Sequence, residues 1–266
     1  MIDIIIPAFN AHETIEYTLM SIAMQKIKNK TTIYIIDDNS INNYDSIINK
    51  FNSFLNIKLV RLNTNVGPAK TRQYALDISK GKYIVFIDAD DLLKNPDSLE
   101  ILYNEIKQGY DYVCSKTYYE ELNSEHVNNG DLHGKIYRRS FLDKNNIYFF
   151  DYRCHEDNAF NNLVLMNNPK ISNINKTTYI YTLNNNSITH NPFKDQTESL
   201  EIYIQAIKKV IEKSTDDNCS QDSINNYIKI KENYLKSIYS SLSKKDKSKL
   251  NLYLKKYNLN KFISLN

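Results

Sequence analysis

The sequence predicts an α/β fold, in which helices cover both faces of a mostly parallel sheet, followed by a C-terminal helical extension. Short apolar runs alternate with segments of helical periodicity through residues 1–110, as expected for strands joined by helical crossovers. Polar clusters follow the apolar runs, at the sheet edge where such folds bind ligands. After Asn191-Pro192 the periodicity is helical throughout.

The first half of the chain gives the clearest elements. Runs rich in Ile, Val and Tyr predict buried strands at residues 2–6, 32–36, 57–62 and 83–87. Helical spacing of apolar residues predicts helices at residues 13–25, 44–54, 68–79 and 96–108. Pro68 after Gly67 and Pro96 after Asn95 fit a first helical turn, where the missing N–H costs nothing.

The second half is less regular. Strands are expected at residues 111–119, 135–137 and 177–182, and a helix at 156–166. Three further helices are expected at residues 197–213, 223–242 and 247–257. The chain therefore divides into one α/β domain, residues 1–192, with halves at 1–110 and 111–192, and a helical region at 193–266.

Charge is unevenly distributed along the chain. Residues 223–266 carry ten Lys against Glu232 and Asp246, a net charge of +8, whereas the remainder holds 24 basic and 29 acidic side chains. The basic tail is compatible with three roles: a helix packed on the core, contact with an anionic membrane, or binding of nucleic acid.

Cysteine usage and hydropathy predict a cytoplasmic protein, with attachment to the inner face of the membrane as an alternative and oligomerisation left open. Cys114, Cys154 and Cys219 have no short spacing, which indicates neither a disulfide framework nor a zinc site. No apolar stretch approaches the roughly 18 residues that a membrane-spanning helix needs.

An acidic motif, Asp88-Ala89-Asp90-Asp91, follows the strand predicted at residues 83–87. Three carboxylates within four residues repel one another unless a cation or several donors neutralise them. Mn²⁺ and Mg²⁺ accept such oxygen ligands together with substrate phosphates, and they stabilise a departing diphosphate. The alternative interpretation is a helix N-terminus, which also favours acidic residues.

Six motifs together make the chain resemble the family 2 glycosyltransferases with the GT-A fold, over residues 1–192. They are Ile4-Ile5-Ile6-Pro7-Ala8-Phe9-Asn10 with Glu13, Ile36-Asp37-Asp38-Asn39-Ser40, Asn65-Val66-Gly67-Pro68-Ala69 with Arg72, Phe86-Ile87-Asp88-Ala89-Asp90-Asp91, Gly134-Lys135-Ile136-Tyr137-Arg138-Arg139, and His155-Glu156-Asp157. The order and spacing of all six carry the resemblance.

The resemblance implies inverting transfer of a sugar from a nucleotide-sugar, a UDP-sugar, to a hydroxyl of a bacterial cell-surface glycan or lipid-linked acceptor. Residues 1–110 would bind the donor through Pro7, Ala8, Phe9, Asn10, Glu13, Asp37, Asp38, Asn65, Gly67, Arg72, Asp88, Ala89 and Asp90. In this scheme Asp38 contacts the uracil edge and Asp88 the ribose. Arg72 lies near the base or the diphosphate.

The same resemblance implies Mn²⁺ or Mg²⁺ bound by Asp90, with Asp88, Asp91 and His190 as further candidate ligands. Five residues separate Asp90 from Pro96 where the family usually has three or four. Asp90 and Asp91 therefore both remain candidates for the ligand.

The acceptor half would supply the catalytic base. An acceptor hydroxyl attacks only when a positioned base takes its proton, and the resemblance assigns this role to Asp157, with Glu156 orienting the acceptor or serving as the base itself. His133, Gly134 and His155 are the candidate acceptor contacts. The alternative is that both acids only favour the N-terminus of the helix at residues 156–166.

Other functions are less well supported by the motifs. A phage-type glycosyltransferase acting on modified DNA bases would suit the basic tail. A nucleotidyltransferase would need a glycine-rich phosphate loop after its first strand, and Pro7-Ala8-Phe9-Asn10 is not one. A non-catalytic module that binds nucleotide-sugars or nucleic acid is the remaining alternative.

Overall fold

A central sheet organises the molecule, and the strands are β1 (Ile2–Ala8), β2 (Thr31–Asp37), β3 (Ile57–Arg61), β4 (Tyr83–Phe86), β5 (Leu92–Leu93), β6 (Tyr112–Tyr119), β7 (Ser124–His126), β8 (Lys135–Arg138) and β9 (Ile171–Tyr181). The computed structural model describes residues 1–127, 130–183, 196–217 and 219–265. Within these residues the nine strands run in the order β3-β2-β1-β4-β8-β6-β9-β5, with β7 beside β6.

Strand direction differs between the two halves of the sheet. The strands β1 to β4 pair in parallel. The strand β8 is antiparallel to both β4 and β6, β9 is parallel to β6, and β5 is antiparallel to β9. The predicted α/β fold is therefore confirmed. The parallel arrangement holds for the first half, and the second half makes the sheet mixed.

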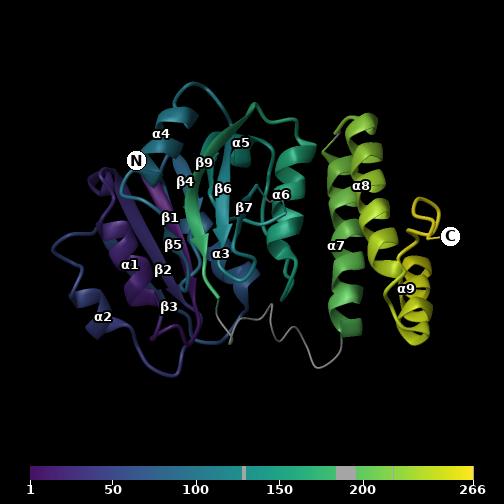
Figure 1. Cartoon of the computed structure of the whole chain (residues 1–266), viewed down its shortest axis with the longest axis horizontal. Helices are drawn as coiled ribbons and strands as arrows, with labels where there is room; N and C mark the ends of the chain where they lie inside the picture. The colour runs from purple at the N-terminus through teal and green to yellow at the C-terminus, as the bar shows by residue number, and fades with distance from the viewer. Residues whose placement is uncertain (128–129, 184–195, 218, 266) are drawn as a thin grey trace.

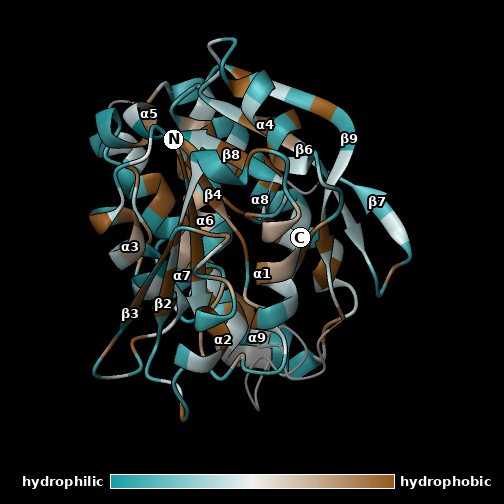
Figure 2. Ribbon diagram, turned by 90° about the vertical axis from the view of Figure 1, so that its left-hand side faces the viewer, coloured by the Kyte–Doolittle hydropathy of each residue, from teal (hydrophilic) through white to brown (hydrophobic). Residues whose placement is uncertain are grey.

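Helices cover both faces of the sheet (Figure 1). One face carries α1 (Ile15–Ala23), α2 (Asp45–Asn49) and α4 (Ser98–Ile106), and the other carries α3 (Pro68–Ile78), α5 (Arg139–Lys144) and α6 (Glu156–Met166). Because side chains alternate along a strand, Ile4 and Ile6 of β1 face the first layer and Ile5 faces the second. Figure 2 shows the apolar residues concentrated on the central strands.

Three C-terminal helices form a further layer against α6 (Figure 1): α7 (Gln196–Asp216), α8 (Gln221–Tyr239) and α9 (Lys244–Lys256). Their buried side chains, among them Ile207, Leu235 and Leu250, join the core cluster that contains Phe160 of α6. The basic tail thus packs on the α/β domain through an apolar face. Its predicted contacts with membrane or nucleic acid stay predictions.

Short elements complete the chain, including a 3-10 helix at Lys28–Lys30 before β2. None of the helices in the described segments is both long and apolar enough to cross a bilayer.

Candidate active site

The loops that follow β1 and β2 are tied to each other. The backbone N–H of Asn10 donates to Ser40 Oγ at 2.9 Å, and Asn10 Oδ1 accepts from the N–H of Ile41 at 2.9 Å. Asn10 has a φ of 52°, in the left-handed region that asparagine tolerates better than most residues. Phe9 beside it is 53% exposed, so an apolar ring faces solvent at the strand end.

Two buried carboxylates lie at the end of β2, Asp37 as its last residue and Asp38 directly after it, and both bind backbone amides. Asp37 accepts from the N–H of Ser40 at 2.8 Å and lies 3.3 Å from Arg61. Asp38 accepts from the N–H of Val66 at 2.7 Å and from that of Gly67 at 2.9 Å. Asp38 therefore fixes the loop that begins α3, and its expected contact with the donor base stays a prediction.

Gly67 ends that loop with a φ of 86°, a conformation that side-chain-bearing residues rarely adopt. Pro68 then begins α3, as its position after Gly67 predicts. Asn65 is exposed, and its amide donates to the carbonyl oxygen of Asp38 at 3.3 Å. Among the other candidate donor-binding residues, Ala8 and Ala89 are buried, Pro7 is half-buried and Glu13 is exposed.

Arg72 of α3 bridges two acidic residues. Its Nη2 donates to Asp88 Oδ1 at 2.6 Å, and its Nη1 donates to Glu156 Oε1 at 2.6 Å. Burial opposes ionisation of Asp88, but Arg72 and His133 hold the pKa of this carboxyl well below its usual value. Burial raises the pKa of Glu156, although Arg72 opposes the shift. The guanidinium thus joins the acidic motif after β4 to the start of α6.

Asp91 anchors the turn that carries the acidic motif. It is 1% exposed, and its carboxylate accepts from the Tyr179 hydroxyl at 2.8 Å and from the N–H of Thr182 at 2.9 Å. Burial raises its pKa to about 8, and the charges of Asp88 and Asp90 add to the effect while His133 opposes it. The side chain of Asp91 therefore points into the fold.

His133 lies between three carboxylates. Its Nε2 is 3.4 Å from Asp88 and 3.6 Å from Asp91, and its Nδ1 is 3.4 Å from Asp131. The ring stacks on Tyr179 at a centroid distance of 4.9 Å. Burial opposes protonation, but the carboxylates raise the pKa of His133 well above its usual value. The imidazolium therefore offsets the charge of the acidic motif, and its contact with an acceptor stays a prediction.

Asp131 and Lys135 lie next to His133; Lys135 belongs to the fifth sequence motif, whereas Asp131 lies outside all six. Asp131 accepts from Lys135 Nζ at 2.6 Å and from the backbone N–H of His133 at 3.1 Å. The hydroxyl of Tyr119 also donates to Asp131. The sequence does contain a pattern that points to these residues: Asp131, His133 and Lys135 alternate with Leu132 and Gly134 where a buried strand begins.

Gly134 follows His133 with a φ of 63°. A Cβ atom here would lie 2.8 Å from Ser115 Oγ, and the Gly134 carbonyl accepts from that hydroxyl. The structure thus requires glycine at this position, and its role toward an acceptor stays a prediction.

The site contains groups suited to a divalent cation. Asp88, Asp91 and His133 each place one ligand atom within 4.8 Å of the other two. Asp91 is buried and already accepts two hydrogen bonds, whereas Asp90 is half-buried in the same motif, and the assignment of the ligand to Asp90 stays a prediction. Carboxylate oxygens of this kind fit Mn²⁺ or Mg²⁺. His190, the fourth candidate, lies outside the described residues.

Asp157 supplies a second acidic centre, on α6. Its Oδ1 accepts from the N–H of Asn158 at 2.6 Å. Burial and the neighbouring Glu156 raise its pKa to about 7, against the opposing charge of Arg72. A carboxylate with a pKa near neutrality is a stronger base than an ordinary one and is still largely ionised above pH 7.

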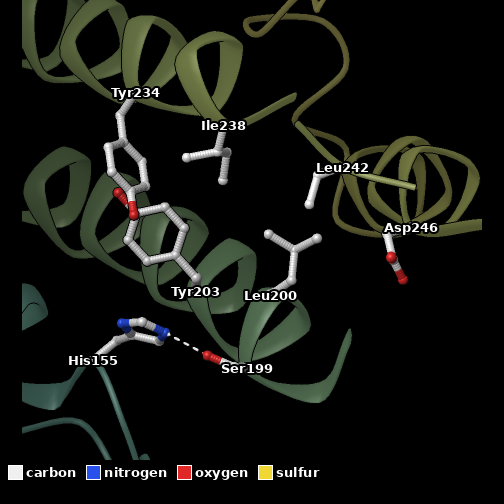
Figure 3. A pocket seen from close by; sticks show the side chains of 8 residues that line it. All are labelled: His155, Ser199, Leu200, Tyr203, Tyr234, Ile238, Leu242 and Asp246. Atoms are coloured by element: carbon white, nitrogen blue, oxygen red, sulfur yellow. Dashed lines mark hydrogen bonds between the residues drawn. The ribbon is translucent and has the colours of Figure 1, made fainter. Parts of the chain in front are cut away.

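His155 caps α6 with a φ of 62° and faces the C-terminal layer. Its Nε2 lies 3.1 Å from Ser199 Oγ, and its ring meets Tyr203 edge to face (Figure 3). Burial lowers its pKa to about 4, so the ring is neutral at pH 7. Together with Tyr234 these residues line a hollow of about 190 Å³, and contact of His155 with an acceptor stays a prediction.

Known proteins resemble the chain in sequence. The sequence profile of Glycosyl transferase family 2 matches residues 3–160. Poly(ribitol-phosphate) beta-N-acetylglucosaminyltransferase TarS of Staphylococcus aureus is 28% identical over 199 residues, which cover 67% of this chain and 35% of TarS. TarP of the same species, which has the same enzyme description, is 30% identical over 205 residues, which cover 68% of this chain and 61% of TarP. The chain thus spans 35% of one relative's length and 61% of the other's.

Solved structures match almost the whole chain. The structure of S. aureus TarS 1-349 in complex with UDP-GlcNAc superposes with a TM-score of 0.83 at 19% identity, covering 98% of this chain and 83% of that one. Mannosyltransferase PcManGT from Pyrobaculum calidifontis, in complex with GDP-Man and Mn²⁺, gives a TM-score of 0.63 at 14% identity, with coverages of 97% and 86%. Both matches include the C-terminal helices, so the shared fold extends beyond residues 1–192.

The order of the motifs, the α/β fold and the extent of the profile match lead to one conclusion. Because the profile covers residues 3–160, more than half of the sequence, the chain belongs to glycosyl transferase family 2.

Proposed function

We propose that the protein transfers a sugar, with inversion, from a UDP-sugar to a hydroxyl of a cell-wall glycan or lipid-linked acceptor, in the cytoplasm. The bridge that Arg72 forms between Asp88 and Glu156, at 2.6 Å on each side, carries the proposal. It joins the acidic motif after β4 to the helix that carries Asp157, and transfer between donor and acceptor needs both centres close together.

The donor would bind at the ends of β1, β2 and β4. Exposed Phe9 offers an apolar surface to the base, and the acidic motif lies where the ribose and diphosphate would reach. Asp90 is the proposed ligand of Mn²⁺ or Mg²⁺, with Asp88 beside it. Such a cation, when bound, supplies charge stabilisation to the leaving diphosphate.

Asp157 is the proposed base. With a pKa raised to about 7, its carboxylate takes the proton of the acceptor hydroxyl as the oxygen attacks the anomeric carbon. The diphosphate leaves from the opposite face, so a single displacement inverts that carbon. Glu156, held by Arg72, fixes the start of α6 and with it the position of Asp157.

The choice of donor and acceptor rests on the relatives. TarS and TarP are named as poly(ribitol-phosphate) N-acetylglucosaminyltransferases, and TarS was crystallised with UDP-GlcNAc. A polyanionic acceptor of this class would also suit the net charge of +8 at residues 223–266. Family membership favours glycosyl transfer over nucleotidyl transfer. DNA would suit the basic tail equally well, and the names of the relatives favour the cell-wall acceptor.

A panel of donors tests the proposal. We expect UDP-GlcNAc or UDP-glucose with Mn²⁺ to raise the melting temperature, because a ligand at 100 times its Kd stabilises by about 2.7 kcal/mol. The same donor should be hydrolysed slowly without acceptor, and EDTA should remove both effects. Stabilisation by GDP-mannose alone would contradict the donor assignment, and stabilisation without hydrolysis would indicate a binding module.

A further inference from the structure

Lys231 occupies a position on α8 where the helix is otherwise apolar. The buried residues of this helix form one face, at Ile224, Tyr227, Ile228, Lys231 and Leu235. Lys231 is 6% exposed, whereas Lys229 and Lys236 on the same helix are exposed. Burying an ammonium group costs free energy unless other groups compensate for its lost hydration. A leucine would pack here at no such cost, so the charge itself requires an explanation.

The ammonium group reaches the start of α6. Lys231 Nζ donates to Asn158 Oδ1 at 2.9 Å and lies 5.6 Å from the ring centroid of Tyr203 and 5.2 Å from that of Tyr227. Asn158 in turn donates its backbone N–H to Asp157 Oδ1 at 2.6 Å. A single residue therefore connects the lysine of the C-terminal layer to the proposed base.

Other groups around Asp157 leave its charge poorly compensated. The charged groups that act on Asp157 and Lys231 come from four elements: Arg72 of α3, Asp131 before β8, Glu156 of α6 and Lys231 of α8. Burial and Glu156 favour the protonated carboxyl group, and the Arg72 guanidinium is shared with Asp88 and Glu156. Neighbouring His155 is neutral at pH 7.

Lys231 adds a second cation to the surroundings of Asp157, through electrostatic attraction between the two groups. Burial lowers the pKa of Lys231 to about 8, and attraction to Asp157 opposes that shift. The ammonium therefore keeps its proton at neutral pH. Because an opposite charge nearby favours the ionised form of a carboxyl group, loss of this cation would leave more of Asp157 protonated.

We propose that Lys231 is a positioning residue, which holds Asn158 and keeps the Asp157 carboxylate ionised so that it accepts a proton at neutral pH. The inference rests on the role given to Asp157 in the proposed function. It also assigns a function to the C-terminal layer, since α8 completes the surroundings of a base that lies on the α/β domain.

Carbon-13 NMR of the full chain labelled at the Asp γ-carbons tests the charge effect without any need for turnover. The Asp157 signal is assigned by its loss in Asp157→Asn. In Lys231→Met we expect the titration midpoint of Asp157 to rise by about one pH unit. Lys231→Arg retains the positive charge and should keep the midpoint at its wild-type value. Lys229→Met replaces an exposed lysine on the same helix and should also leave the midpoint unaltered.

A purely structural role would give a different result. Lys231→Met removes the cost of burying an ammonium group, and a protonated Asp157 needs no counter-charge, so at a pH below the Asp157 pKa the variant should melt no lower than the wild type. An unchanged midpoint together with a lower melting temperature would overturn the proposal and make Lys231 a packing residue.

Kinetics separate this inference from the proposed function. As the pH is lowered, the rate of UDP-GlcNAc hydrolysis should begin to fall at a higher pH in Lys231→Met than in the wild type. At alkaline pH, where Asp157 is ionised in both proteins, the two rates should converge. Turnover that persists in Asp157→Asn would refute the base assignment, and the role of Lys231 in catalysis with it. If Asp157→Asn is inactive but the rate of Lys231→Met falls at the same acidic pH as that of the wild type, the role of Lys231 alone is refuted.

Discussion

Arg72 Nη1 donates to Glu156 Oε1 at 2.6 Å, across 84 residues of sequence. Arg72 lies on α3, which packs against β1 and β2, and Glu156 is the first residue of α6. Since the same guanidinium binds Asp88, one side chain connects the turn after β4 to the start of α6. The relative position of the two acidic centres therefore depends on Arg72.

Removing Arg72 should be costly for stability. Arg72→Met leaves Asp88 and Glu156 without their shared partner, and breaking a buried ion pair from one side costs about 3–5 kcal/mol. Glu156→Gln keeps an oxygen that accepts from Arg72 and should cost less. Urea denaturation of both variants checks the order, and equal losses would show that the Glu156 charge contributes as much as the whole bridge.

Asp157→Asn should abolish most of the turnover with little effect on donor binding. The amide keeps the shape of the carboxylate but cannot accept the proton, so kcat should fall by about 10²- to 10⁴-fold. In the wild type, kcat/KM should rise with pH through about 7, because the base acts only when ionised and its pKa is raised to about 7. Turnover near the wild-type rate would transfer the role to Glu156, to be tested by Glu156→Gln.

The fold could be read from the sequence wherever a run of apolar residues fills a buried strand. Most residues of β1, β2 and β4 are Ile, Val, Tyr or Phe packed on both faces, and all three strands were predicted within two residues at either end. The two-residue β5 and three-residue β7 are too short to show a periodicity. The strand β9 begins at Ile171, whereas the prediction placed its start at residue 177. The first residues of β9 alternate between exposed and half-buried positions, so they form no apolar run that would mark a strand.

The candidate site could be predicted from the sequence only where its residues stand next to one another along the chain. The acidic motif and Glu156-Asp157 follow from position at a strand end and a helix start, supported by the family resemblance. Pairs such as Arg72 with Glu156 depend on tertiary packing, which no spacing in the sequence encodes. Lys231 is an intermediate case, because its place in an apolar stripe is visible while its contact with Asn158 is not.

Asp90 and Asp91 should respond differently to substitution. If Asp90 holds the cation, Asp90→Ala should remove Mn²⁺-dependent binding of UDP and leave the melting temperature unchanged or higher, because carboxylate repulsion falls. Asp91→Ala should instead lower the melting temperature, since it removes the acceptor of Tyr179 and Thr182. Calorimetry with UDP and Mn²⁺ distinguishes them, and retained metal-dependent binding in Asp90→Ala would reassign the ligand.

Leu250 of α9 should prove more important to stability than the lysines around it. Its side chain is fully buried in the cluster that includes Leu254 and the α6 core, and truncation of a buried leucine costs about 2–5 kcal/mol. Lys245→Ala changes an exposed residue on the same helix and should shift the free energy of unfolding by less than about 0.5 kcal/mol. If α9 were only loosely attached, both variants would unfold at the same denaturant concentration as the wild type. A selective loss in Leu250→Ala would establish that α9 is an integral layer of the fold.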